Sequence, residues 1–195
     1  MKSLKILLFS VLSFVFLAAE CTREDDEFFN AVYTTIPNLV AVETQTNFQV
    51  NDFIWVNSNA FSRWVTEPNQ STLLDVLQTT NATEFNFLYT LERNDGSNNW
   101  VNVTPSNANF SIEKGSFSLG NYITAKPLYN PTNHLYEYRG GIRLTQTGQY
   151  RLRFFAGFDG TNFDLISKNT PGSTFLTIGT TATNASGGFY NFTVN

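Results

Sequence analysis

Hydrophobic and polar residues alternate along most of the chain after residue 30, and helical periodicity is almost absent there. Phe85, Phe87, Tyr89 and Leu91 occupy every second position of one such segment. Successive side chains of a strand point to opposite faces of its sheet, so this spacing predicts a strand with one buried face.

Turn-forming clusters separate the predicted strands. Residues 94–99 include an Asp-Gly pair, which tolerates the positive φ of a tight turn, and residues 100–103 resume a strand pattern. These two strands are predicted to form a hairpin. Residues 150–156 and 163–166 flank the turn cluster 159–162, and the same reasoning predicts a second hairpin there.

The remaining segments are predicted to form one short helix and further short strands. One short helix is predicted at residues 71–78, with Ser71 as its N-cap. Short strands separated by turns at this density are typical of an all-β sandwich. Further strands are predicted at residues 39–42, 48–50, 53–56, 110–113, 122–127, 141–144, 175–181 and 189–194, with a turn at 184–188 between the last two.

The sequence Gly148-Gln149-Tyr150 resembles the tyrosine corner of immunoglobulin-like sandwiches, in which a Gly-x-Tyr opens a strand. Gln146 stands where that family usually has Asp, two residues before the glycine. The resemblance implies an immunoglobulin-like antiparallel β-sandwich in which the Tyr150 hydroxyl bonds to nearby backbone.

Composition indicates one β domain. Only 14% of the residues are charged, whereas the chain has 19 Phe and is rich in Asn, Thr and Ser. Its single cysteine, Cys21, rules out an intrachain disulfide. Residues 31–195 are predicted to form one sandwich domain, because roughly 165 residues are enough for a hydrophobic core.

The N-terminus has the pattern of a signal peptide. Lys2 and Lys5 precede an apolar run at residues 6–19, which is too short for a permanent transmembrane helix. A cysteine at position 21 resembles the lipobox of bacterial lipoproteins, in which the thiol is acylated. The resemblance implies that residues 1–20 are a lipoprotein signal peptide and that Cys21 is lipidated.

One position departs from the lipobox pattern. Glu20 stands where the pattern has a small residue. The alternative is ordinary signal-peptidase cleavage near Ala19, which leaves a free thiol close to the mature N-terminus.

An acidic run follows the cysteine, formed by Glu24, Asp25, Asp26 and Glu27. It resembles the export signal of Bacteroidota surface lipoproteins, which implies a lipid anchor in the outer membrane and exposure at the cell surface. Residues 21–30 are accordingly predicted to be an acidic tether, since like charges repel. Residues 47–56 also resemble a strand–turn–strand of flavobacterial surface lipoproteins.

The charge balance argues against a nucleic-acid partner. The chain has a net charge of −4, which becomes −5 without residues 1–20, since these carry two Lys and one Glu. Phosphate binding needs a concentrated cationic face. The predicted partners are therefore the membrane, through the N-terminal lipid, and a glycan or an envelope protein.

Catalytic and cofactor signatures are missing. The only histidine, His134, lies in a predicted loop, and zinc binding needs clustered His or Cys ligands. A glycosidase needs two carboxylates in one cleft, and local sequence marks no such pair. The protein is predicted not to be an enzyme and to hold no cofactor. The available carboxylates are Glu43, Asp52, Asp75, Glu84, Glu113, Asp159 and Asp164.

Two ligand-binding candidates arise from the residue types. Trp64 with its neighbour Arg63 lies in a non-periodic segment, where an exposed indole could stack on a sugar ring; Trp55 and Trp100 are predicted to pack in the core or at strand edges. The predicted function is non-catalytic binding or a structural role in the cell envelope. The alternative is a carbohydrate-binding accessory protein of a glycan-uptake system.

A weak calcium candidate is the oxygen set Asp159, Asn162 and Asp164. The EF-hand pattern is not met, and hairpin turn chemistry accounts for the acidic and glycine residues. No metal site is therefore assigned.

Overall fold

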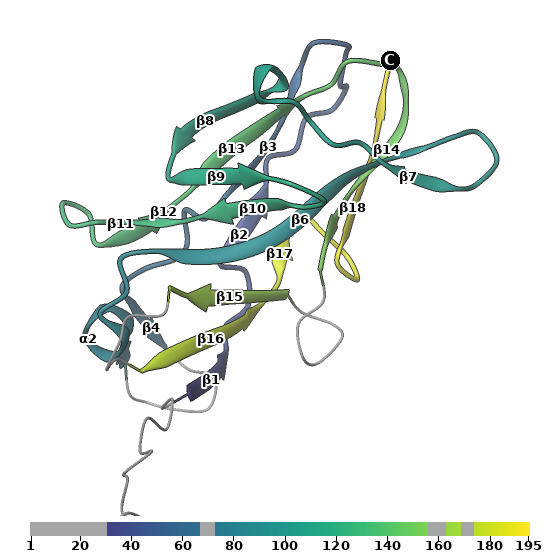
Figure 1. Ribbon diagram of the computed structural model, residues 1–195. Helices are drawn as coiled ribbons and strands as arrows, with labels where there is room; N and C mark the ends of the chain where they lie inside the picture. The colour runs from purple at the N-terminus through teal and green to yellow at the C-terminus, as the bar shows by residue number, and fades with distance from the viewer. Residues whose placement is uncertain (1–30, 67–72, 156–162, 169–173) are drawn as a thin grey trace, which may run out of the picture.

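The computed structural model describes residues 31–66, 73–155, 163–168 and 174–195, and these form two packed β-sheets with little helix (Figure 1). The all-β sandwich expected from the alternation is confirmed. The larger sheet runs in the order β1 (Ala31–Thr35), β16 (Phe175–Thr180), β15 (Phe163–Ser167), β6 (Phe85–Asn94), β10 (Ile123–Lys126) and β9 (Ser116–Leu119).

Three more strands join this sheet away from that path. They are β7 (Trp100–Asn102) on β6, β14 (Gly148–Phe154) on β6, and β18 (Phe189–Val194) on β14. The smaller sheet has the order β17 (Ala182–Thr183), β2 (Val40–Val42), β3 (Phe53–Asn57), β13 (Arg139–Arg143) and β8 (Phe110–Lys114).

Two short ribbons and two short helices complete the described part. One ribbon pairs β11 (Leu128–Asn130) with β12 (Leu135–Glu137), and the other pairs β4 (Trp64–Thr66) with β5 (Leu73–Asp75). The helices are α2 (Val76–Thr80) and a 3₁₀ turn at Asn107–Asn109.

The core lies between the two sheets. Phe85, Phe87, Tyr89 and Leu91 of β6 are all buried, as their spacing predicted. The smaller sheet contributes aliphatic side chains to the same core, among them Val40, Val42, Ile54, Val56 and Ile142. The hydroxyl groups of Tyr89 and Tyr138 form a hydrogen bond with each other inside this core, with their oxygen atoms 2.9 Å apart.

The hairpin predicted around residues 94–99 is confirmed. β6 pairs with β7 in antiparallel register, with Arg93 opposite Val101 and Asn94 opposite Trp100. Gly96 has a φ of +90°, which the Asp-Gly pair allows. The turn predicted at residues 184–188 is also present, with positive φ at Asn184, Gly187 and Gly188.

The second predicted hairpin is wrong. β14 and β15 do not pair with each other; instead both pair with β6, β14 along its Tyr89–Arg93 half and β15 at Phe85 and Asn86. Both run antiparallel to β6, so they continue in one direction along the same edge. The ten-residue length of β6 offers enough edge for two successive strands.

Two further expectations need correction. The predicted helix at 71–78 is replaced by β5 followed by α2, and the N-cap is Asp75, whose carboxylate accepts a hydrogen bond from the Gln78 N–H; Ser71 lies outside the described residues. The predicted strand at 48–50 is reduced to a single bridge between Phe48 and Val194.

The sandwich is also mixed, whereas the resemblance implied an antiparallel one. β1 pairs parallel with β16, and β17 pairs parallel with β2. The chain passes from the large sheet to the small one between Thr180 and Ala182; β17 forms the edge of the small sheet, whereas β16 lies next to the edge strand β1 of the large one.

The tyrosine corner is confirmed. The Tyr150 hydroxyl donates a 3.0 Å hydrogen bond to the backbone carbonyl oxygen of Gln146, and Tyr150 itself is buried. Substituting Gln for the usual Asp therefore leaves this contact intact, since the acceptor is a backbone atom.

Replacing Tyr150 by Phe should lower the free energy of unfolding by about 1–2 kcal/mol, because the Gln146 carbonyl loses its donor while the ring stays in place. Urea denaturation of the two proteins measures the difference. Equal unfolding midpoints would show that the corner hydrogen bond does not stabilise the fold.

Candidate functional site

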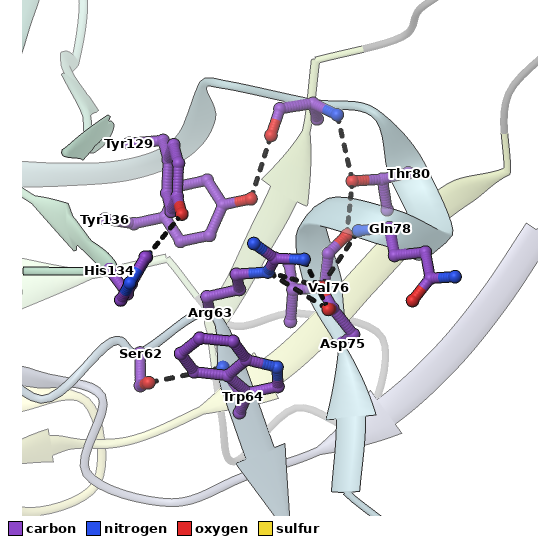
Figure 2. A network of polar contacts seen from close by, with 11 residues as sticks. Ser62, Arg63, Trp64, Asp75, Val76, Gln78, Thr80, Tyr129, His134 and Tyr136 are labelled. Carbon is purple, nitrogen blue, oxygen red and sulfur yellow. Dashed lines mark hydrogen bonds and ion pairs between the residues drawn. The ribbon is translucent and has the colours of Figure 1, made fainter. Parts of the chain in front are cut away.

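Trp64 begins the short strand β4 and is presented at the surface, with 41% of its area exposed. The next residue, Val65, points the opposite way and is buried, so strand alternation determines the exposure of the indole. Figure 2 shows the residues that surround it. The indole therefore has the exposure that stacking on a sugar ring would require.

Arg63 is held by a carboxylate rather than left free. Its Nε lies 2.8 Å from Asp75 Oδ1 and its Nη2 lies 2.6 Å from Asp75 Oδ2, a bidentate pair. The guanidinium carbon is 4.9 Å from the centre of the Trp64 ring. Arg63 therefore neutralises Asp75 and supports the indole at the same time.

Asp75 connects the β4–β5 ribbon to helix α2. It lies opposite Trp64 in the β4–β5 ribbon, and its Oδ1 also accepts the Gln78 N–H at the start of α2. The hydrogen bonds from Arg63 lower the pKa of Asp75 from 3.8 to about 2. The carboxylate is thus ionised at neutral pH and fixes the Arg63 side chain.

His134 and Tyr129 form the other side of the site. The His134 ring packs edge-on against Trp64, with ring centres 5.0 Å apart, and its Nδ1 shares a 2.9 Å hydrogen bond with the Tyr129 hydroxyl. The His134 carbonyl accepts the Arg63 N–H at 2.8 Å. This backbone hydrogen bond attaches the turn around His134 to the segment that carries Trp64.

A buried layer supports these surface residues. The Tyr136 hydroxyl donates to the Ala82 carbonyl at 2.8 Å, while the Thr80 hydroxyl donates to the Val76 carbonyl and accepts the Ala82 N–H. Phe61 stacks on Tyr136 with ring centres 4.7 Å apart. The result is an indole held beside an imidazole, a phenol and a guanidinium on a packed base.

The other two tryptophans lie on the outer faces of the sheets. Arg139 covers the Trp55 ring at 4.1 Å, and Arg151 covers the Trp100 ring at 4.4 Å. Both side chains are half-buried. Both pack under arginines. Trp100 lies on β7, which among the described strands pairs with β6 alone and so is an edge strand, as predicted, whereas Trp55 lies on the central strand β3 and outside the core.

The carboxylates do not form a glycosidase-like pair in a described hollow. Glu43 and Glu113 both bind Arg139, and this pairing lowers the pKa of Glu43. Neither of the two hollows of about 350 Å³ described on the large sheet is lined by two carboxylates. Among the described residues, no group of three His, Cys, Asp or Glu could hold a metal ion.

Several predicted site residues lie outside the described residues. These are Cys21, the acidic residues Glu24, Asp25, Asp26 and Glu27, and the calcium candidates Asp159 and Asn162. The third calcium candidate, Asp164, lies on β15 at the rim of a hollow. Within the described ranges, no helix is long and apolar enough to cross a membrane.

Comparison with protein-family models, with curated proteins and with solved structures finds no match to this chain. The fold defines it as an all-β sandwich protein.

Proposed function

We propose that the chain is a non-catalytic lipoprotein of the cell envelope, anchored in the outer membrane of a Bacteroidota cell by a lipid on Cys21. The order of cationic, apolar and acidic segments around this cysteine supports the proposal. The first described strand, β1, begins at Ala31, ten positions after Cys21.

Replacing Cys21 by Ser should move the protein from the membrane fraction to the soluble fraction, because a hydroxyl cannot take the place of the acylated thiol. Phase partitioning in a cloud-point detergent and intact mass of the full chain measure the change. Thr22→Ser is the matched control and should stay in the detergent phase. Detergent partitioning of the Cys21→Ser protein would contradict a lipid anchor.

A second candidate function is carbohydrate binding as an accessory of a glycan-uptake system. The observation that supports it is the exposed Trp64 indole, which contacts Arg63 and His134, while His134 in turn bonds to the Tyr129 hydroxyl. An indole offers an apolar face to the C–H side of a sugar ring, while imidazole and phenol groups can bond its hydroxyls.

Replacing Trp64 by Ala should weaken glycan binding about tenfold or more while the fold is retained, because the stacking surface is lost and Val65 still anchors the strand. Affinity electrophoresis of the full chain through gels containing soluble polysaccharides measures binding. Tyr122→Ala removes a similarly exposed aromatic elsewhere and serves as control. If both variants migrate like the unmodified protein, Trp64 is not a glycan-binding residue.

A further inference from the structure

One of the two hollows on the large sheet lies beside Trp100, on the outer face of the sheet and away from Trp64. It has a volume of about 350 Å³ and is bordered by Trp100, Gln149, Asn191 and Thr193, with Tyr150 and Phe192 beneath. Figure 1 shows β7, β14 and β18 at one end of the sandwich and β4 with α2 at the other. The hollow is therefore a separate surface, and its volume lies within the range of small-ligand sites.

Strand register brings its polar side chains together. Gln149 is directly opposite Thr193 in the β14–β18 pair, and Asn191 is opposite Arg151. The intervening Tyr150 points into the core and is buried, so the three polar side chains stand on the outer face and are exposed. None of these three side chains bonds to another described residue.

The Trp100 indole closes one side of the hollow and is held in place. The Arg151 guanidinium lies between the rings of Trp100 and Phe189, at 4.4 Å and 4.5 Å from their centres. Glu92 accepts a 2.6 Å hydrogen bond from the Arg151 Nε, and the Glu92 side chain is only 9% exposed. An indole fixed in this way needs little reordering when a ligand binds.

The chemistry of the lining selects a neutral ligand. Two amides and a hydroxyl can each donate and accept hydrogen bonds, which suits the hydroxyl groups of a sugar. No carboxylate, guanidinium or ammonium lines the hollow, and the nearby Arg151 is paired with Glu92, which also binds Arg153. An anionic ligand would find no cation of its own there.

We propose that this hollow is a second carbohydrate-binding site, for neutral glycans, in which Trp100 stacks on a sugar ring and Gln149, Asn191 and Thr193 bond its hydroxyls. The proposal extends the carbohydrate-binding candidate function and rests on it for the class of ligand. Two sites at opposite ends of the domain would let one polysaccharide chain engage both, or let two chains be held together.

The test uses the full chain in mild detergent and affinity gels containing xyloglucan, galactomannan, dextran or the anionic polygalacturonate. Trp100→Ala and the double variant Gln149→Ala/Asn191→Ala should each be retarded about tenfold less by at least one neutral polysaccharide. Among the described residues the double variant removes no side-chain hydrogen bond, so its thermal midpoint should equal that of the unmodified protein. Trp64→Ala is run in parallel.

The outcomes separate the two sites. Weaker retardation in both the Trp100→Ala protein and the double variant supports the second site, whatever Trp64→Ala does. If only Trp64→Ala weakens retardation, the second site is excluded and the first one stands. Retardation by polygalacturonate alone, or by none of the four polymers, overturns the proposal for a neutral glycan.

Discussion

Replacing Phe61 by Ala is expected to lower the free energy of unfolding by about 3–5 kcal/mol, the usual loss when a fully buried Phe is truncated. The Phe61 side chain has no exposed area, and its ring contacts Phe85 edge-on and stacks on Tyr136, with centre distances of 5.0 Å and 4.7 Å. Truncation would leave a cavity at the point where the β4–β5 ribbon meets the core.

The same substitution should also affect the Trp64 site. The Phe61 carbonyl accepts the Tyr136 N–H at 2.8 Å, and two residues later the Arg63 N–H bonds to His134. A looser Phe61 would free the segment that carries Arg63 and Trp64.

Urea denaturation gives the stability change, and Phe61→Leu is the matched control, because it keeps most of the volume and should lose less than half as much stability. Similar losses for Ala and Leu would mean that the aromatic contacts, rather than the filled volume, determine the effect. A loss below about 1 kcal/mol for Ala would contradict the packing described for this region.

The sequence predicted those features that depend on local chemistry. Alternation along β6 identified its buried face, and the Asp-Gly pair identified the β6–β7 turn. The tyrosine corner could be predicted because its donor and acceptor are only four residues apart, at Tyr150 and Gln146. In each case the residues that determine the structure are close neighbours in the chain.

Pairing between distant segments could not be predicted in the same way. A turn cluster between two strand patterns normally indicates a hairpin. Here β14 and β15 each pair with β6 instead of with each other. Likewise, the three residues of β5 pair with β4 instead of continuing the α2 helix, because Asp75 is bound by Arg63 and caps the helix at that point.

The candidate site likewise combines a feature that depends on nearby residues with partners that come from distant segments. Trp64 could be selected from its residue type and its non-periodic surroundings. The partners that give the site its shape come from elsewhere in the chain, since Tyr129 and His134 lie more than sixty residues from Trp64. The hollow at Trp100 was missed because its polar residues come from β14 and β18, which only the sheet register brings together.

Replacing Gly115 by Ala is expected to destabilise the fold by about 3 kcal/mol, through backbone strain and crowding together. Gly115 joins β8 to β9 with a φ of +73°, which L-residues rarely adopt. A Cβ there would lie 2.6 Å from the Lys126 carbonyl oxygen and 2.7 Å from that of Glu137. Both are backbone atoms, so the strands themselves would have to move.

Gly187→Ala separates the two contributions. Gly187 also has a positive φ, +57°, but an added Cβ would meet nothing within 4 Å, so this variant should lose only the roughly 1 kcal/mol of backbone strain. Thermal and urea unfolding of both variants give the difference, which measures the crowding at Gly115. Equal losses of stability would mean that β8 and β9 can shift away from β10 and β12 at no cost in free energy. The close backbone packing around Gly115 would then not stabilise the sandwich.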